Sequence, residues 1–235
     1  MNNEASVSGH ISKRFDQELE DIRNRVLTMG GLVETQVNNG IKCLIDSDSE
    51  LAHKVVAKDR EVNQLEMEID QQCLQILARR QPAASDLRLV VAIIKTIADL
   101  ERIGDQAQKL GKHQLELVDA RVSASTFVKL EHLGDLVSKN LNLALDAFAR
   151  MNVQDAIDTI SRDARVNTEF ESMMRELITH MMEDPRTIKG ALRVSWSARA
   201  LERIGDHANN ICEYVVFLVE GKDVRHIDAL DELDL

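Results

Sequence analysis

The sequence predicts an all-α protein built from two tandem, pseudo-symmetric three-helix bundles, and three observations support this prediction. The pentapeptide Glu-Arg-Ile-Gly-Asp occurs twice, at 101–105 and 202–206. Aromatic residues make up only 3% of the chain and there are only two prolines, so strand formers and turn residues are scarce. Apolar residues of the first segment recur three and four positions apart, which is the spacing of an amphipathic helix.

The repeat extends well beyond the pentapeptide. Residues 99–107 run parallel to residues 200–208 at a shift of 101 (202 − 101), and Val62-Asn63 matches Val166-Asn167 at a shift of 104 (166 − 62). Pro82 and Pro185 lie in the interval where the shift changes. Because proline interrupts a helix, both prolines mark the same turn. Each half therefore reads as helix, helix, proline turn, helix.

The boundaries follow from periodicity and capping residues. We expect helices over 11–46, 49–80, 85–118, 124–151, 154–183 and 186–220. Asp48 or Ser49 is expected to cap the second helix, Ser85 the third, and Gly221 to stop the last. Gly30-Gly31 indicates either a kink in the first helix or a closely packed neighbour, and we favour the neighbour. The domains expected are 11–118 and 123–221, followed by a short acidic tail over 222–235.

Composition narrows the function. A net charge of −11 argues against nucleic-acid binding, since an acidic surface repels phosphates. No apolar run approaches the length of a membrane span, and the first ten residues lack the layout of a signal peptide, so we expect a cytoplasmic protein. Three isolated cysteines without paired spacing are expected to be buried thiols. Packing is also the role expected for Trp196 and four methionines, namely Met173, Met174, Met181 and Met182.

Acidic residues are the most informative polar feature. Glu101 and Asp105 lie four residues apart on one helix face, as do Glu202 and Asp206, and the first pair is in line with an apolar stripe. Unpaired charge in such a place is costly, so an arginine or a metal cation must balance it. A second stripe on the preceding helix consists of Asp59, Asn63, Glu66 and Asp70. The second half keeps only Asp163 and Asn167 of that stripe, with Phe170 and Met174 replacing the other two acids.

Two interpretations of these acids remain open from the residues alone. Oxygen donors suit Mg²⁺, Mn²⁺, Ca²⁺ or iron better than zinc, which favours a metal site. The structural alternative is that Gly104 and Gly205 permit close helix approach while Arg102 and Arg203 pair with acids on adjacent helices. His207 is expected to be a surface or core histidine. No metalloprotease spacing, nucleophile elbow or phosphate-binding loop is present, so no catalytic constellation is indicated.

Further motifs give the chain a resemblance to a known family. They are Met-Gly-Gly at 29–31, Asp-x-x-x-Asn at 59–63 and 163–167, Gln-Pro-x-x-Ser-Asp-Leu-Arg at 81–88, and Met-Met-Glu-Asp-x-Arg-Thr-Ile at 181–188. Together with the repeated pentapeptide, their order and spacing resemble the PhoU family of bacterial phosphate-specific transport accessory proteins over nearly the whole chain.

The resemblance implies a dimeric, cytoplasmic negative regulator of the phosphate-starvation (Pho) regulon rather than an enzyme. It implies an adaptor between the ATPase of the phosphate ABC transporter and the sensor histidine kinase PhoR, reaching the membrane only through these partners. Some family members carry metal clusters on Glu/Asp-x-x-x-Asp motifs, which implies a divalent metal (Mg, Mn, Fe or Zn) here. The ligands carried over are Glu101, Asp105, Glu202 and Asp206, with Asp59, Asn63, Asp163 and Asn167 as completing residues.

Two rival functions remain beside the adaptor. One is a metal-binding helical bundle with its own metal-dependent or storage activity, and the other is a passive dimeric scaffold.

Overall fold

A computed structural model describes residues 4–82, 84–117 and 123–224, and every regular element in these ranges is helical. The elements are α1 (Glu4–Ile45), α2 (Ser49–Arg80), α3 (Ala84–Leu117), α4 (Ala124–Arg150), α5 (Val153–Glu183), the 3₁₀ turn η1 (Pro185–Thr187) and α6 (Ile188–Glu220). The expected all-α class with two helical repeats is confirmed. The expected end of the third helix at Val118 and the tail residues 225–235 lie outside the described residues.

The helix boundaries mostly agree with the sequence, but α6 begins at Ile188 instead of 186, after the 3₁₀ turn, and the starts of α1 and α3 also differ. Asp48 caps α2, and its side chain accepts a hydrogen bond from the Leu51 backbone N–H at 2.9 Å. Gly221 ends α6 in the left-handed conformation, with φ of 73°. By contrast, α1 begins at Glu4 instead of Ile11, and Ser85 is the second residue of α3 instead of its cap. Residues 4–10 therefore extend the first helix although they lack an amphipathic pattern.

The glycine pair of α1 lies within an uninterrupted helix. A Cβ at Gly30 would lie 2.7 Å from Cδ2 of Leu145 on α4, whereas one at Gly31 would meet nothing within 4 Å. The close neighbour expected from the sequence is therefore present at Gly30 only. At this point the two repeats approach each other through their first helices.

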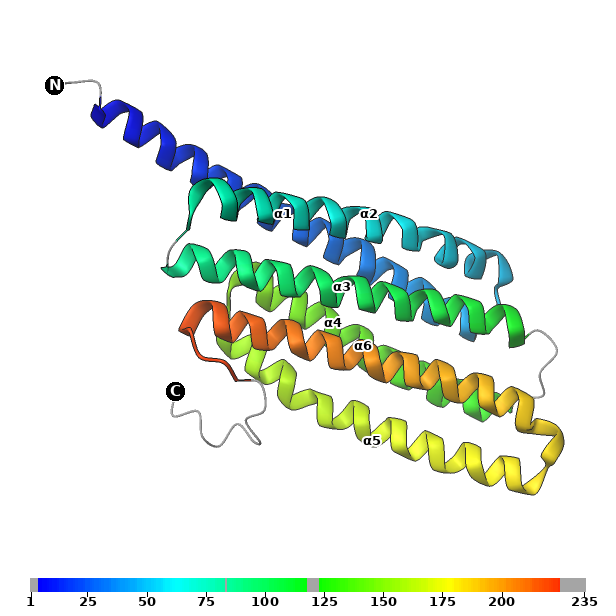
Figure 1. Cartoon of the computed structure of the whole chain (residues 1–235). Helices are drawn as coiled ribbons and strands as arrows, with labels where there is room; N and C mark the ends of the chain where they lie inside the picture. The colour runs from blue at the N-terminus through cyan, green and yellow to red at the C-terminus, as the bar shows by residue number, and fades with distance from the viewer. Residues whose placement is uncertain (1–3, 83, 118–122, 225–235) are drawn as a thin grey trace.

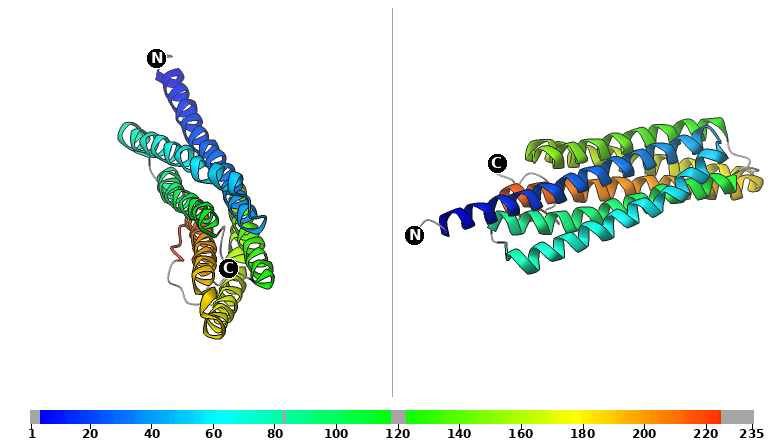
Figure 2. Two further views of the ribbon diagram at one scale, coloured as in Figure 1. Left: turned by 90° about the vertical axis from the view of Figure 1, so that its right-hand side faces the viewer. Right: turned by 90° about the horizontal axis from the view of Figure 1, so that it is seen from above.

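The six long helices run side by side along the long axis of the molecule (Figure 1). Helices α2, α3, α6 and α5 follow one another in that order across the front of this view, and α1 and α4 lie behind them. The end-on and top views in Figure 2 show the same two layers. The repeats meet where α3 packs on α6 and α1 on α4. The start of α1 projects past the bundle at the end where α6 stops.

A single buried core runs through both repeats. It includes Leu100 and Ile103 of α3 and their repeat equivalents Leu201 and Ile204 of α6, which are all fully buried. Burial removes these side chains from water and stabilises the fold by about 1.5–3 kcal/mol each. The three cysteines are also buried, as expected, and burial raises the pKa of each thiol to about 12. In the described part of the chain, no helix is long and apolar enough to cross a bilayer.

Candidate functional site

The first acidic cluster joins α2 to α3. We define it as Asp59, Asn63, Glu66, Glu101 and Asp105. The charge of Asp105 raises the pKa of both Asp59 and Glu101, and the charge of Glu66 also raises the pKa of Glu101, although burial is the larger cause in each case. The structure therefore brings together the carboxylates that the sequence predicted from two separate stripes.

Asp59 is the most buried member of this cluster, with 6% of its surface exposed. Its Oδ2 accepts hydrogen bonds from Gln108 at 2.9 Å and from Asn63 at 3.4 Å. Its Oδ1 is buried without a hydrogen-bond partner, and so is Oδ1 of Asn63. Gln108 was not predicted from the sequence, although it lies on α3 one turn after Asp105 and so on the same face.

The second acidic cluster occupies the equivalent place between α5 and α6. We define it as Asp163, Asn167, Glu202, Asp206 and Asn209. Burial is the main cause that raises the pKa of Asp163 and Glu202, and the charge of Asp206 adds to it. Buried oxygens without partners are Oδ1 of Asp163, Oε2 of Glu202 and Oδ1 of Asn209. Asn209 was not predicted, and it is the repeat equivalent of Gln108 in the first cluster.

The glycines of the pentapeptide bring the helices of each cluster together. A Cβ at Gly104 would lie 3.3 Å from Cγ1 of Val62 on α2, and one at Gly205 would lie 3.1 Å from Oδ1 of Asp163 on α5. Both distances are tighter than most real Cβ contacts, so a side chain here would force the helices or the Asp163 carboxylate to move. The expectation of close approach at both glycines is confirmed.

Among the residues that the structure describes, Arg102 and Arg203 form no ion pair with an acid on an adjacent helix, contrary to the expectation. Arg102 lies 3.8 Å from Asp99 on its own helix. Glu202 is instead held by Arg199, whose guanidinium Nη1 donates to Oε1 at 2.8 Å within α6. Each carboxylate cluster thus keeps buried oxygen atoms that no arginine reaches.

The chemistry of the two clusters fits a hard cation, but their side chains do not enclose one. Buried carboxylate and amide oxygens without partners are the donors that Mg²⁺, Mn²⁺ or Ca²⁺ would use. Among the residues that the structure describes, no group of three or more His, Cys, Asp or Glu side chains is arranged to hold an ion. Metal binding at the predicted ligands therefore stays a prediction, and it would need side-chain rotation.

A buried network that was not predicted lies between the repeats. Asp99 of α3 is 2% exposed, and its carboxylate accepts from His207 Nδ1 at 2.7 Å, Asn210 at 3.1 Å and Tyr214 at 2.8 Å, all on α6. Burial raises the pKa of this carboxyl, but the hydrogen bonds from the three α6 side chains outweigh it and hold the pKa below its ordinary value. The repeat equivalent of Asp99 is Ala200, so the network is present on one side only.

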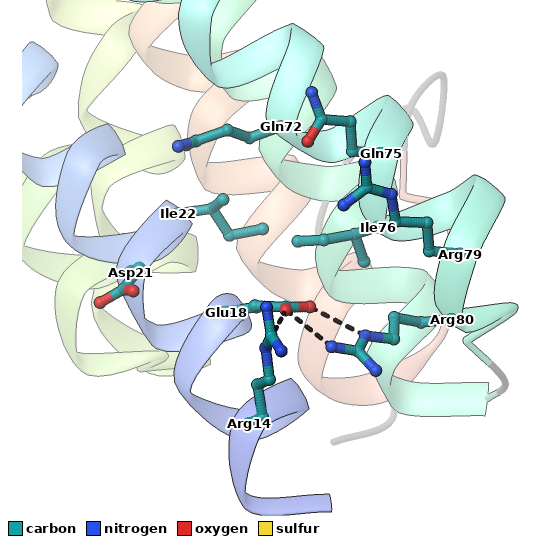
Figure 3. A pocket seen from close by; sticks show the side chains of 9 residues that line it. All are labelled: Arg14, Glu18, Asp21, Ile22, Gln72, Gln75, Ile76, Arg79 and Arg80. Atoms are coloured by element: carbon teal, nitrogen blue, oxygen red, sulfur yellow. Dashed lines mark hydrogen bonds and ion pairs between the residues drawn. The ribbon is translucent and has the colours of Figure 1, made fainter. Parts of the chain in front are cut away.

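A hollow lies away from both clusters, at the end of the molecule where α1 projects past α2. Its volume is about 370 Å³. Figure 3 shows Arg14 and Arg80 converging on Glu18, with Ile22 and Ile76 facing each other nearby. Arg80 forms two hydrogen bonds to Glu18, at 2.9 and 2.7 Å, and these lower the pKa of Glu18 more than any other cause. The polar side of this hollow therefore joins α1 to α2.

Some apolar residues expected to pack in the core are at the surface. Trp196 is 45% exposed and Met182 is 80% exposed, whereas Met173 is buried as expected. The prediction was wrong for Trp196 and Met182 because α5 and α6 carry apolar side chains on their outer face as well as on their core face.

The fold and the two clusters define a class of protein: a helical tandem-repeat protein that carries one acidic site per repeat. The PhoU domain model matches the chain twice, over residues 26–113 and 130–215. The chain therefore belongs to the PhoU family. This is a family of regulatory accessory proteins, not enzymes, in agreement with the sequence prediction.

Several relatives resemble the chain over nearly their full length. The phosphate-specific transport system accessory protein PhoU homolog of Pseudomonas aeruginosa is 50% identical over 97% of this chain and 94% of its own length. PhoU of Escherichia coli (strain K12), also named as a phosphate-specific transport system accessory protein, is 46% identical with the same coverage.

Two solved structures are also similar. The crystal structure of Pseudomonas aeruginosa PhoU matches with a TM-score of 0.86 and 50% identity, covering 88% of this chain and 100% of that one. The phosphate transport system regulatory protein PhoU of Streptococcus pneumoniae matches with a TM-score of 0.83 and 30% identity, covering 89% and 99%.

Proposed function

We propose that this protein is a negative regulator of the Pho regulon and a modulator of phosphate uptake. It acts in the cytoplasm, as a homodimeric adaptor between the ATPase of the phosphate ABC transporter and the sensor kinase PhoR. The observation that supports this most is its relation to proteins named as phosphate transport accessory proteins, at up to 50% identity over nearly their whole length. The relation includes both repeats and both pentapeptides, so it is not limited to one domain.

An adaptor of this kind regulates by binding two states of a partner with different affinity. The chain offers a rigid frame for such binding, because one continuous core joins the two repeats. The chain also carries two acidic clusters at equivalent places in the two repeats, and the clusters differ in their oxygen donors. We propose that the acidic surface of one bundle binds a cytoplasmic domain of the kinase. The other bundle binds the transporter and senses its conformation.

The test is the output of a phosphate-starvation reporter in a strain that lacks the protein. The strain is complemented with the wild type or with Glu101→Gln/Asp105→Asn/Glu202→Gln/Asp206→Asn. A matched control makes the same change in charge at four exposed acids outside the clusters, in the variant Glu20→Gln/Glu131→Gln/Asp146→Asn/Asp158→Asn. Immunoblotting and circular dichroism check that each protein accumulates folded.

Each outcome separates one proposal from another. Repression by the wild type and the control in high phosphate, but not by the cluster variant, would show that the duplicated acids act in regulation. Equal repression by all three would make the acids structural and place the regulatory face elsewhere. Failure of the wild type to repress would contradict the regulator proposal itself.

A metal-binding bundle with its own activity is a second candidate, favoured by the buried oxygens without partners in both clusters. Glu101, Asp105, Asp59 and Asn63 would hold the ion in the first cluster, and Glu202, Asp206, Asp163 and Asn167 in the second. Equilibrium dialysis of the full chain against Mn²⁺ tests this independently of signalling. Two sites per chain in the wild type and none in the cluster variant would support it, and no binding by the wild type at millimolar Mn²⁺ would exclude it.

A further inference from the structure

The outer surface of the α5–α6 hairpin carries an apolar patch. We define it by five exposed side chains, namely Ile178 and Met182 of α5 and Ile188, Leu192 and Trp196 of α6. The two α5 residues are four positions apart, and the three α6 residues follow one another at intervals of four, so each set lines one helix face. Because the helices are joined by the short turn η1, the two helix segments that carry these rows lie beside each other near one end of the molecule (Figure 1).

The size of the patch is that of an interface core. Its side chains are 39–80% exposed. We estimate that they present on the order of 500 Å² of apolar surface, at the upper end of what one patch on a typical monomer shows. A standard interface buries about 800 Å² on each partner, with an apolar centre and a polar rim. The patch is large enough to be that centre.

The first repeat has exposed apolar side chains at the equivalents of Ile178 and Ile188, namely Leu74 and Leu87, but it lacks the two largest side chains of the patch. At the shifts of 104 and 101, Met182 corresponds to Ala78 and Trp196 to Lys95. Lys95 packs its ammonium group 5.4 Å from the centre of the Tyr214 ring, so a charged residue is accommodated at this position of the three-helix bundle. The two largest contributors to the patch are therefore additions of the second repeat.

Trp196 is held in place before any partner arrives. The Arg193 guanidinium lies 4.5 Å from the centre of its indole ring, and the His113 ring centre lies 6.1 Å away. A side chain that is already ordered loses little entropy on binding, and tryptophan is among the residues that contribute most to interface energy. These contacts give the patch a fixed central anchor.

The charges around the patch indicate what covers it. The rim carries three ion pairs, Arg175–Glu171, Arg186–Asp184 and Arg193–Glu116, together with Lys189 and Glu183. With the Arg199–Glu202 pair one turn after Trp196, five bases and five acids lie around the patch, so the rim is balanced in a chain whose net charge is −11. Two copies that meet elsewhere on this acidic surface repel each other, whereas a balanced rim of mixed sign is complementary to itself under a two-fold axis.

We propose that the patch is the interface between two copies of this chain, with Trp196 at its centre. This inference rests on the homodimer of the proposed function and specifies its face. The first acidic cluster lies on the α2–α3 pair of the other repeat and then stays open to partners in the dimer.

Trp196 is the only tryptophan of the chain, so the unmodified protein reports on this face. Light scattering follows the mass of the full-length protein during serial dilution, while fluorescence follows the emission and acrylamide quenching of Trp196. We expect dimer dissociation to coincide with a red shift and at least a twofold rise in quenching. A dimer that dissociates without a change at Trp196 would overturn the face and leave the dimer intact. A wild type that is monomeric at about 100 μM would overturn both, and reporter repression would then decide separately on regulation.

Substitution gives a second, independent test. Met182→Ala/Trp196→Lys installs the residues of the first repeat, so the variant should fold, and its dimer dissociation constant should rise at least 100-fold. The control Met67→Ala/Leu74→Ala removes two comparably exposed apolar side chains from α2 and should change the constant less than threefold. Equal effects of the two variants, or a patch variant that dimerises like the wild type, would contradict the proposal. The proposal would also be contradicted if the patch bound a different protein and not a second copy of this chain, because that protein would then be the partner that covers the patch.

Discussion

Removal of the Asp99 carboxylate should destabilise the protein by an amount that the structure lets us estimate. In Asp99→Ala, three α6 donors lose their common acceptor in a site where Asp99 itself is 2% exposed. Hydrogen bonds to a charged group contribute about 1.5–3 kcal/mol each, and the desolvation of the buried carboxylate offsets part of their sum. We expect a net loss of about 3 kcal/mol in the free energy of unfolding.

Steric effects should add little to this value. The repeat equivalent of Asp99 is Ala200, which is 3% exposed in the same kind of helix contact, so alanine fits the architecture. Asp99→Asn serves as the matched variant, because it keeps the volume and one acceptor oxygen but loses the charge. Its amide nitrogen cannot accept a hydrogen bond, and we expect it to lose about 1–2 kcal/mol.

Urea unfolding followed by far-ultraviolet circular dichroism and by Trp196 emission measures both losses. Because the folded-state pKa of Asp99 is lowered, its contribution is complete above its ordinary pKa of 3.8 and is lost as the pH falls through the lower, folded value. The difference in stability between the wild type and Asp99→Ala should therefore be full at pH 7, begin to shrink near pH 3.8 and continue to shrink as the pH falls through the lower, folded value. A difference under about 0.5 kcal/mol at pH 7, or one that does not shrink in acid, would refute the reasoning.

Three further predictions concern the helix contacts, the acidic clusters and the thiols. Gly111→Ala should lower the free energy of unfolding by about 1–3 kcal/mol, because its Cβ would lie 3.0 Å from the Ala52 carbonyl oxygen. Gly31→Ala should raise it by up to about 1 kcal/mol, because its Cβ would meet nothing within 4 Å. If both variants shifted the urea midpoint in the same direction, this reasoning would be contradicted. Glu101→Gln/Glu202→Gln should raise the melting temperature at pH 7 without metal, because the raised pKa of both carboxyls means that the folded state loses stability as the pH rises through these values; calorimetry should show the gain disappear near pH 4, and a gain of equal size at both pH values would rule this out. The three thiols, with a pKa of about 12, should resist a disulfide reagent at pH 8 until urea unfolds the chain, so rapid labelling of the folded protein would show that they are not buried.

The helices and turns could be predicted because their signals are local. Apolar periodicity, two prolines, Asp48 and Gly221 specify most boundaries without reference to any partner helix. The start of α1 at Glu4 escaped prediction, because residues 4–10 hold no amphipathic pattern. Helix formation there follows from continuation of an existing helix, which costs less than starting a new one.

The acidic clusters were half predictable for a related reason. The spacing within one helix places Glu101 beside Asp105, and the duplication identifies the pair as a feature of the fold. Gln108 and Asn209 are repeat equivalents at the shift of 101 and complete the two clusters, but an amide within a polar helix face does not by itself indicate a site. The Asp99 network depends on the pairing of α3 with α6, which is a contact between repeats that no pattern within one helix specifies.

The one-sided Asp99 network has a consequence for how the duplicated halves can be rearranged. Two copies of the α4–α6 half could not reproduce the α3–α6 contact, because Ala200 would stand where the carboxylate is needed. Two copies of the α1–α3 half would place Gln106 where His207 donates. The two halves are thus complementary, because the first supplies the hydrogen-bond acceptor and the second supplies the donors. The α3–α6 contact therefore forms only when one copy of each half is present. A split version of the protein should reassemble from its two different fragments and not from either fragment alone.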